Sequence, residues 1–299
     1  MSNPMLFAVT CLIWGSTWIA INFQISELDP AVSVAFRFTI AACILGLWCL
    51  LRRLPLKLSL QTHKQLVLVG LLFYTLDYTF LYAAQHHIIS ALLALLSSTI
   101  IYINVVLRRI MLGKPMRFEV IVGASFGLLG IFLIFIPEFK NMDMNEGLVM
   151  GLLFASASFL SAGLGNVVSE KILDAGTPVI QMNFWAMSYS LIFTYGFALF
   201  SGASFSLPKE PNFYYALVYL ALFGSVLAFG AYMKLLQQIG SDKAAYVVLI
   251  YPIVALAIST LFEAYQWTLV SALGVIIVLF GNAVAMGKVA MFMREAPEI

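Results

Sequence analysis

One carboxylate, Asp77, lies in the middle of an apolar run at residues 65–85. At a helical rise of 1.5 Å per residue it lies about 13 Å from His86 at the end of this run, near the midplane of a hydrocarbon layer about 30 Å thick. A carboxylate at that depth faces a cavity, pairs with a base or is protonated. It could bind a substrate amine or carry a proton. The alternatives are an ion pair with Arg37 and a protonated acid bonded to a tyrosine hydroxyl.

Helical spacing surrounds Asp77 with an aromatic and polar stripe. The stripe consists of Tyr74, Asp77, Tyr78, Leu81 and Gln85. Lipid does not solvate such a stripe, so this helix face is expected to point into the protein.

A basic residue, Arg37, lies about 10 Å inside the preceding apolar run, measured from its outer end. Its guanidinium could hold a substrate carboxylate through paired hydrogen bonds. It could also snorkel outward along its own stem or brace Asp77, and these structural roles stay open beside the binding role.

Aromatic and polar residues recur at helical spacing in other apolar runs. Trp14, Trp18 and Asn22 share one face, and mixed stripes on further runs include Asn104, Ser158, Trp185, Ser225 and Tyr232. Several such faces converging on one centre favour a wet, amphiphilic cavity. The predicted substrate site consists of Trp14, Trp18, Asn22, Arg37, Tyr74, Asp77, Tyr78, Asn104, Trp185 and Tyr232.

Two further features concern helix shape and packing. Pro252 frees a backbone carbonyl inside its run, which allows a kink that a gate can use, although a static kink is the alternative. Gly123, Gly127 and Gly130 form a small-residue seam typical of helix packing.

The composition identifies the kind of protein that holds these residues. The chain has 299 residues, of which 62% are hydrophobic and 10% charged, with a mean hydropathy of +0.98. Soluble domains carry about 25% charged residues, so this is an integral membrane protein. A net charge of +2 without a long basic run argues against nucleic acid as a partner. Cys11, Cys43 and Cys49 all lie in apolar stretches, which favours neither a disulfide framework nor a metal site.

Charged, proline and glycine breaks divide the chain into ten apolar runs, and we expect an all-α membrane protein with ten transmembrane helices. The runs cover residues 4–25, 31–51, 65–85, 89–107, 118–137, 147–168, 179–201, 212–236, 244–262 and 268–287.

The distribution of Lys and Arg among the connections predicts the orientation. Most bases fall on one side, whereas the other side holds Lys140 and Lys209 with several acids, including Glu263. Because basic connections stay in the cytoplasm, both termini are predicted to be cytoplasmic.

The two halves of the chain match at nearly constant offsets of 148 to 151 residues. The matched pairs are Pro30 with Pro178, Phe36 with Phe184, Phe73 with Phe223, Tyr82 with Tyr232, Gly123 with Gly274, and Gly130 with Gly281. Five helices in each half make the repeats inverted, an arrangement that builds two gates around one central cavity. The expected units are a first repeat at residues 1–140, a second at 147–288 and a short cytoplasmic tail at 289–299.

Several motifs along the chain resemble the drug/metabolite transporter superfamily, of the EamA type. They are Trp14-Gly15-Ser16-Thr17-Trp18, Phe36-Arg37-Phe38, Ser90-Ala91, Gly123-x6-Gly130, Gly165-Asn166, Pro252 with Glu263, and Gly274-x6-Gly281. The resemblance implies a secondary transporter of small metabolites, often an exporter of amino acids or related compounds. It also implies that helices one to four and six to nine surround the cavity, with the fifth and tenth as outer supports. The chain departs from the pattern at Lys114, where relatives usually carry an acid.

The absence of a phosphate-binding Gly-x4-Gly-Lys-Ser/Thr loop argues against ATP-driven transport by this chain alone. An intramembrane enzyme and a channel without alternating access are the alternatives to a transporter. Arg37 is the only deep base, which disfavours phosphorylated substrates. One deep acid and many aromatic residues suit a zwitterion such as an amino acid, with protons as a candidate coupling ion. We expect a multi-pass protein of the bacterial inner membrane without cofactor or metal.

Overall fold

The structure is a computed structural model that describes residues 1–25, 28–88, 93, 96–139, 146–262 and 267–285. All regular secondary structure in these residues is helical. The elements are α1 (Asn3–Ile25), α2 (Pro30–Leu51), α3 (Leu60–Val69), η1 (Gly70–Leu76), α4 (Asp77–Gln85), α6 (Ile100–Leu112), α7 (Phe118–Phe139), α8 (Glu146–Asp174), α9 (Val179–Phe200), α10 (Pro211–Tyr219), η2 (Leu220–Leu227), α11 (Ala228–Ile239), α12 (Ser241–Ala244), α13 (Val247–Phe262) and α14 (Leu269–Ala285).

Six helical stretches in the described residues are long and apolar enough to cross a membrane. They are Asn3–Gln24, Pro30–Leu51, Leu60–Gln85, Glu146–Asp174, Pro211–Ile239 and Ser241–Ile258. Two shorter apolar helices, Phe118–Ile134 and Leu269–Ala285, accompany them. The expected all-α character is therefore confirmed for these residues, in a chain with several helices able to span a bilayer.

Local signals in the sequence explain where individual helices begin and end. The Asp29 side chain accepts a hydrogen bond from the Ala31 amide at 2.8 Å, and Pro30 occupies the first turn of α2. Ser59 caps α3 through the Thr62 amide at 3.1 Å. These caps satisfy amide groups that lack partners within the first helical turn.

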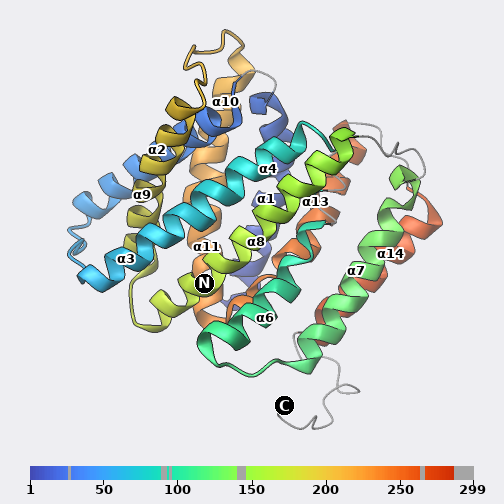
Figure 1. Cartoon of the computed structure of the whole chain (residues 1–299). Helices are drawn as coiled ribbons and strands as arrows, with labels where there is room; N and C mark the ends of the chain where they lie inside the picture. Colours follow the sequence, from blue (N-terminus) through green and yellow to red (C-terminus); the bar gives the residue numbers. More distant parts are fainter. Residues whose placement is uncertain (26–27, 89–92, 94–95, 140–145, 263–266, 286–299) are drawn as a thin grey trace.

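Most helices pack into one bundle, and α7 and α14 form a pair at its side (Figure 1). Within the bundle, α2 packs on α9, α1 on α13, and α8 on both α4 and α6. Gly130 and Gly274 let α7 and α14 approach closely, because a Cβ at either glycine would lie 2.5 Å from the carbonyl oxygen of the other. The small-residue seam in the sequence therefore serves packing, as expected.

Two of the long helices contain a π-helical segment, in which the backbone hydrogen bonds reach back five residues. In η1 the Asp77 amide bonds to the Leu72 carbonyl, and in η2 the Ala228 amide bonds to the Phe223 carbonyl. The segments begin at Gly70 and Leu220, 150 residues apart. Each π-helical turn changes the direction in which the neighbouring side chains point, relative to an ordinary α-helix. It therefore changes which of these side chains face the interior of the bundle.

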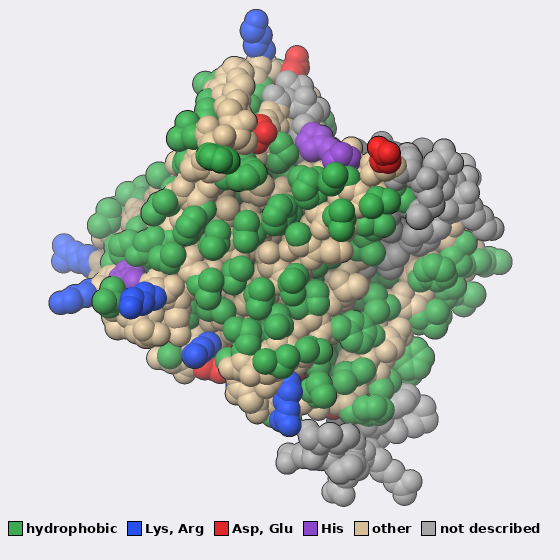
Figure 2. All heavy atoms as spheres, in the orientation of Figure 1, with side chains coloured by type: hydrophobic (Ala, Val, Ile, Leu, Met, Phe, Trp, Pro, Cys, Tyr) green, Lys and Arg blue, Asp and Glu red, His purple; other side chains and the backbone are tan. Residues whose placement is uncertain are grey.

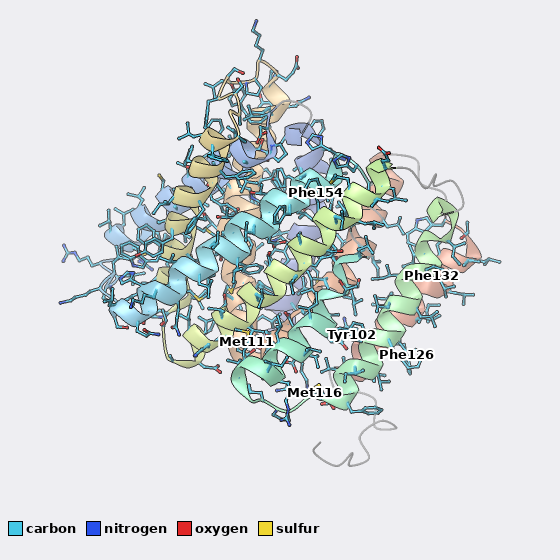
Figure 3. The ribbon with its side chains drawn as sticks, in the orientation of Figure 1. Tyr102, Met111, Met116, Phe126, Phe132 and Phe154 are labelled. Atoms are coloured by element: carbon cyan, nitrogen blue, oxygen red, sulfur yellow. The ribbon has the colours of Figure 1, made fainter. Side chains whose placement is uncertain are left out.

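The molecular surface has an apolar belt with charges at its ends. On the face in Figure 2, Lys and Arg side chains lie mainly along the lower and left margins, and hydrophobic side chains cover the region above them. Figure 3 shows apolar side chains along the outer surface, where Met111 of α6, Met116 of the α6–α7 connection and Phe132 of α7 are 42%, 44% and 49% exposed. Such a surface suits contact with lipid.

Some expected boundaries differ from the structure. Helix α8 continues to Asp174, beyond the expected end at residue 168, because Glu170 and Asp174 form ion pairs with Arg108 and Lys114. The helix expected at 89–107 is described only in part, and α6 begins at Ile100. The tail at 289–299, Glu263 and Ser90 lie outside the described residues.

Candidate functional site

A cavity of about 90 Å³ lies inside the bundle, between residues of both halves of the chain. Its lining combines aromatic, polar and charged side chains: Trp14, Thr17, Trp18, Ile21, Arg37, Phe73, Asp77, Tyr78, Leu81, Ser97, Ile100, Phe159, Ala162, Asn166, Phe229, Tyr232, Val248 and Tyr251. Pockets for small molecules usually measure about 300–1,000 Å³. The cavity is therefore too small for a metabolite here, and side chains or helices must move to admit one.

Arg37 extends from α2 into this cavity and is 1% exposed. Its Nε donates to Ser225 Oγ at 2.8 Å and its Nη1 donates to Tyr82 Oη at 3.3 Å. The guanidinium carbon lies 4.6 Å from the centre of the Tyr78 ring, a cation–π distance. Neutral groups thus hold the guanidinium in place and leave its charge uncompensated by these contacts.

Asp77 begins α4 directly after η1 and is 8% exposed. Ser158 of α8 donates its hydroxyl to Asp77 Oδ1 at 2.6 Å. This short bond is typical of a hydroxyl donating to a carboxylate. A serine, neutral like the partners of Arg37, therefore fixes the carboxyl group.

The acid and the base share one cavity without forming a pair. Among the ion pairs within 4.0 Å that join described residues, none connects Arg37 with Asp77. The alternatives of a direct ion pair and of a tyrosine partner for Asp77 are thus not the contacts found here. A ligand carrying both charges could reach each group separately.

Aromatic rings form a wall of the same cavity. The Trp14 ring lies 4.9 Å from Tyr232 and 5.2 Å from Phe229, measured between ring centres. Trp18 lies 5.8 Å from Tyr251, whose hydroxyl bonds to Ser97 at 2.7 Å. The wall offers apolar contact area together with a few hydroxyl groups, a combination that suits an amphiphilic molecule.

Six of the ten predicted site residues line the cavity, namely Trp14, Trp18, Arg37, Asp77, Tyr78 and Tyr232. The other four lie elsewhere. Asn22 is exposed on α1, and buried Asn104 donates to the Ser241 carbonyl at 3.0 Å. Trp185 donates to the Leu56 carbonyl at 3.0 Å. Tyr74 is buried and donates to Asn183 Oδ1 at 3.1 Å.

The π-helical turn of η1 explains the position of Tyr74. In an α-helix Tyr74 shares a face with Asp77 and Tyr78, but the extra residue per turn changes this register. Phe73 therefore lines the cavity, and Tyr74 turns toward α9. Pro252 lies buried inside α13, next to the lining residue Tyr251.

Sequence reasoning missed the groups that hold the two charges. Ser158 and Ser225 stand out in the sequence only as members of polar stripes, and Tyr82 only as a repeat match. A serine in an apolar helix is too common to name a partner. A charged residue deep in a membrane helix requires a polar partner. Its presence in the sequence therefore indicates that polar residues on other helices are candidate partners.

The described residues contain no group of three or more His, Cys, Asp and Glu side chains placed to hold a metal ion. The polar atoms of the cavity belong to one acid, one base, hydroxyls, an amide and two indole N–H groups. This set can bind a small polar or zwitterionic molecule.

Comparison with known proteins places the chain in a family. The model of the EamA-like transporter family matches residues 2–136 and again residues 149–287. The chain is 25% identical to the uncharacterized transporter YoaV of Bacillus subtilis, over 90% of this chain and 91% of that protein. It is 27% identical to the uncharacterized inner membrane transporter YedA of Escherichia coli K12, over 85% of this chain and 80% of that protein.

Two further similarities agree with these matches. A protein of Escherichia coli K12 named "Probable amino-acid metabolite efflux pump" is 20% identical over 93% of both chains. One crystal structure matches 98% of this chain and 99% of its own with a TM-score of 0.79 at 16% identity, which shows a shared fold. Since the family model covers nearly the whole chain in two consecutive matches, this protein belongs to the EamA-like transporter family.

Proposed function

We propose that this protein is a secondary transporter that moves a small zwitterion, such as an amino acid or a related metabolite, by alternating access. The observation that carries the proposal is the cavity in which Arg37 and Asp77 are each held by neutral groups. Arg37 binds the substrate carboxylate, Asp77 binds its amine, and the aromatic wall contacts its apolar part. The named function of the similar efflux pump supports this substrate class and an outward direction of transport.

Ten transmembrane helices in two inverted repeats form the proposed architecture. The two consecutive family matches and the π-helical segments 150 residues apart support a repeat. The repeats occupy residues 1–140 and 147–288. Inverted repeats supply one gate on each side of a shared cavity.

The proposed orientation places both termini in the cytoplasm of a bacterial inner membrane. Its support is the excess of Lys and Arg on one side and the description of the similar protein YedA as an inner membrane transporter. The α9–α10 connection, which carries Lys209, lies at the end of the bundle opposite the α6–α7 connection (Figure 1). It would face away from the cytoplasm.

The small cavity also bears on the transport cycle. A cavity of about 90 Å³ is smaller than a site that holds a metabolite, so it must widen during transport. We assign the opening to movement of the helices that carry the lining residues, with Pro252 allowing α13 to bend.

A matched set of three ligands tests the substrate class. An amino acid, the amine left after removing its carboxylate and the acid left after removing its amine are added separately to the purified protein. The amino acid should raise the melting temperature most, because it alone engages both charges. A library of amino acids identifies the side chain, and uptake into proteoliposomes then measures transport.

Equal stabilisation by the amine or the acid alone would contradict two-charge recognition. Stabilisation by a sugar phosphate but by no zwitterion would overturn the substrate class. Dependence of uptake on a proton gradient in the wild type, and its loss in Asp77→Asn, would assign the proton to Asp77.

A further inference from the structure

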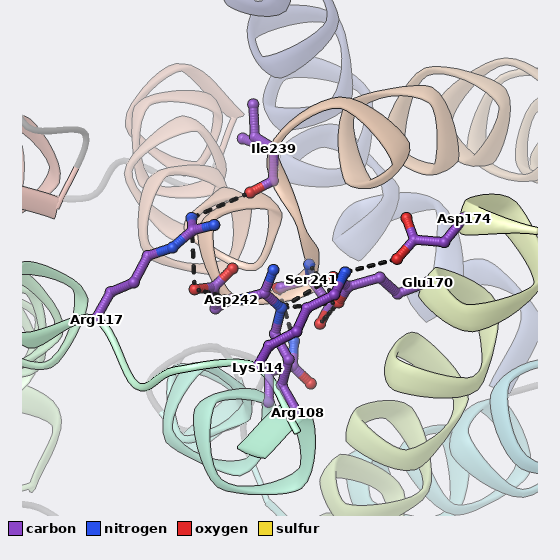
Figure 4. A network of polar contacts seen from close by, with 9 residues as sticks. Arg108, Lys114, Arg117, Glu170, Asp174, Ile239, Ser241 and Asp242 are labelled. Carbon is purple, nitrogen blue, oxygen red and sulfur yellow. Dashed lines mark hydrogen bonds and ion pairs between the residues drawn. The ribbon is translucent and has the colours of Figure 1, made fainter. Parts of the chain in front are cut away.

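Six charged residues form a network beyond the cavity, toward the end of the bundle where α6 and α8 finish (Figure 4). We name it the basic-end network, and it consists of Arg108, Lys114, Arg117, Glu170, Asp174 and Asp242. Helices that line the cavity also carry this network. On α8, Glu170 follows the lining residue Asn166 by four residues, about 6 Å at the helical rise. On α6, Arg108 follows the lining residue Ile100 by eight residues, about 12 Å.

The centre of the network is buried. Arg108 Nε lies 2.9 Å and 3.1 Å from the two carboxylate oxygens of Glu170, and Arg108 Nη1 lies 3.3 Å from Asp242 Oδ2. Ser241 donates its amide at 3.0 Å and its hydroxyl at 2.6 Å to Glu170 Oε2. Arg108, Glu170 and Asp242 are 5%, 1% and 2% exposed, and the network borders an open polar pocket of about 390 Å³.

The rim of the network is partly accessible. Lys114 Nζ lies 2.8 Å from Glu170 Oε1 and 2.6 Å from Asp174 Oδ2. Arg117 Nη1 lies 3.6 Å from Asp242 Oδ2 and 3.4 Å from the Ile239 carbonyl. Three bases thus meet three acids, and Lys114 is paired with two of them.

One half of the chain supplies every base and the other half every acid. The bases lie within residues 108–117 and the acids within residues 170–242. Separating these segments would therefore break all five ion pairs together. Gly240 fits this contact closely, because a Cβ there would lie 2.8 Å from Arg108 Nη2, and its φ of +86° favours glycine.

Two further hydrogen bonds involve residues next to the network; the first lies within the second half of the chain, and the second joins the two halves. Tyr232 donates to Asn166 Oδ1 at 3.1 Å, and Asn104 donates to the Ser241 carbonyl at 3.0 Å. Tyr232 and Asn166 line the cavity, whereas the Asn104–Ser241 bond joins α6 to the residue that also donates to Glu170.

Ion pairs suit a closure that must reopen. Burying paired charges costs desolvation energy that nearly offsets their attraction, whereas separation in water restores their hydration. An apolar plug of the same size would expose its surface on opening and so resist it. A gate made of ion pairs can thus be stable while water is excluded, and its opening costs little free energy once water hydrates the separated charges.

We propose that the basic-end network is the gate that closes the cavity toward the basic end, with Lys114 as the rim residue that sets how often the gate opens. This proposal rests on the proposed transport function, in which the cavity opens alternately to the two sides. In the structure the gate is closed, and opening requires residues 108–117 to separate from α8 and α12.

Labelling of one introduced thiol in the cavity tests the gate without knowledge of the substrate. Cys11, Cys43 and Cys49 are replaced by Ala, and Ala162→Cys places a thiol in the cavity lining. A membrane-impermeant thiol reagent is added to vesicles of either orientation. Lys114→Glu places a third carboxylate beside Glu170 and Asp174, and the repulsion between these charges favours the open gate. It should accelerate labelling from the basic side about tenfold, the change expected for a shift of about 1.4 kcal/mol in the opening equilibrium.

Two further variants provide the controls. Lys64→Glu makes the same charge change at an exposed position outside the network and should leave the labelling rate unchanged. Lys114→Glu combined with Asp174→Lys restores one ion pair with reversed charges and should return labelling toward the original rate. Melting temperature is measured for every variant, so that unfolding is not mistaken for opening.

The outcomes separate this proposal from the transport function. If the thiol introduced by Ala162→Cys is labelled from both sides and Lys114→Glu leaves both rates unchanged in a folded protein, the gate is refuted and alternating access stands. If this thiol is labelled from neither side in any variant, the cavity is not a transport site and both proposals fail.

Discussion

In the cavity, Arg37 and Asp77 are bonded to hydroxyls, whereas in the basic-end network Arg108 and Glu170 are bonded to each other. All four residues are buried, and none is more than 8% exposed. The difference lies in the partner. A buried charge satisfied by an opposite charge has little capacity left for a ligand, whereas one held by neutral groups retains its electrostatic attraction.

We therefore expect the two regions to have different roles, one in closing the bundle and the other in binding. Paired charges join the two halves of the chain, and in our proposal they close one end. The separated charges, in our proposal, are kept for binding, at a cost in stability that surrounding hydroxyls and aromatic rings offset only in part. This contrast predicts that substitutions in the network act on folding or opening, whereas substitutions in the cavity act on binding.

The largest loss of stability is expected from Arg108→Met. It leaves Glu170 and Asp242 buried without their central base, which costs about 3–5 kcal/mol of unfolding free energy. Arg109→Met, an exposed neighbour, should change stability little. Denaturation of both purified variants measures the difference. Neutralising the acids as well, with Glu170→Gln and Asp242→Asn, should recover much of the loss, and a failure to recover any would place the effect outside the ion pairs.

Asp77→Asn should have a smaller effect on folding and a large effect on transport. The amide retains an acceptor for the Ser158 hydroxyl, so the unfolding free energy should change by about 1 kcal/mol or less. Loss of a hydrogen bond to a charged group should lower substrate affinity about 10- to 100-fold. Melting and flux are measured on the same preparation, with Glu210→Gln as an exposed control.

A different pattern would give Asp77 a structural role. If the residue braces Arg37, Asp77→Asn should lower the melting temperature, and an added Arg37→Met should restore it. Unchanged flux in a folded Asp77→Asn protein would remove this residue from the site.

The smallest effect on stability is expected at the rim, from Lys114→Gln. Its side chain is 33% exposed, so its ion pairs should contribute about 1 kcal/mol or less. Partial burial lowers the pKa of Lys114, but the contacts with Asp174 and Glu170 outweigh this and raise it above its ordinary value of 10.5. The stabilisation is therefore fully present below pH 10.5 and is lost as the pH rises through the raised pKa.

Denaturation of the wild type and Lys114→Gln at a series of pH values tests this. The wild type should keep a constant advantage from about pH 7 to about pH 10 and lose it above that range. An advantage that grew above pH 10.5 would contradict the assignment of the ion pairs.

Hydropathy and periodicity predict much of the fold, because membrane depth restricts charged residues so strongly. The depth of Asp77 and Arg37 and the stripe of Trp14 and Trp18 follow from spacing alone, and the structure places these residues at one cavity. The helix register around η1 could not be predicted from the sequence, because no pattern of hydropathy or periodicity indicates a π-helical turn. Phe73 therefore replaces Tyr74 in the lining.

The basic-end network shows a second limit. Its ion-paired residues are 56 to 134 positions apart, so only tertiary packing brings them together. A sequence signal does exist, since Glu170, Asp174 and Asp242 are acids on the side where bases dominate. The presence of these acids among many bases predicts ion pairs on that side of the membrane. It does not predict which base pairs with which acid.

Arg37→Met provides the most direct test of the central claim that the separated charges in the cavity serve binding. Melting and ligand binding are measured on one purified sample, beside Arg108→Met. We predict that Arg37→Met folds within about 1–2 kcal/mol of the wild type, because Ser225 and Tyr82 lose a neutral hydrogen-bond partner and Tyr78 loses a cation–π contact. It should lose binding of the amino acid and retain binding of the matching amine. A loss of stability as large as that of Arg108→Met, with unchanged affinity for the amino acid, would contradict the account.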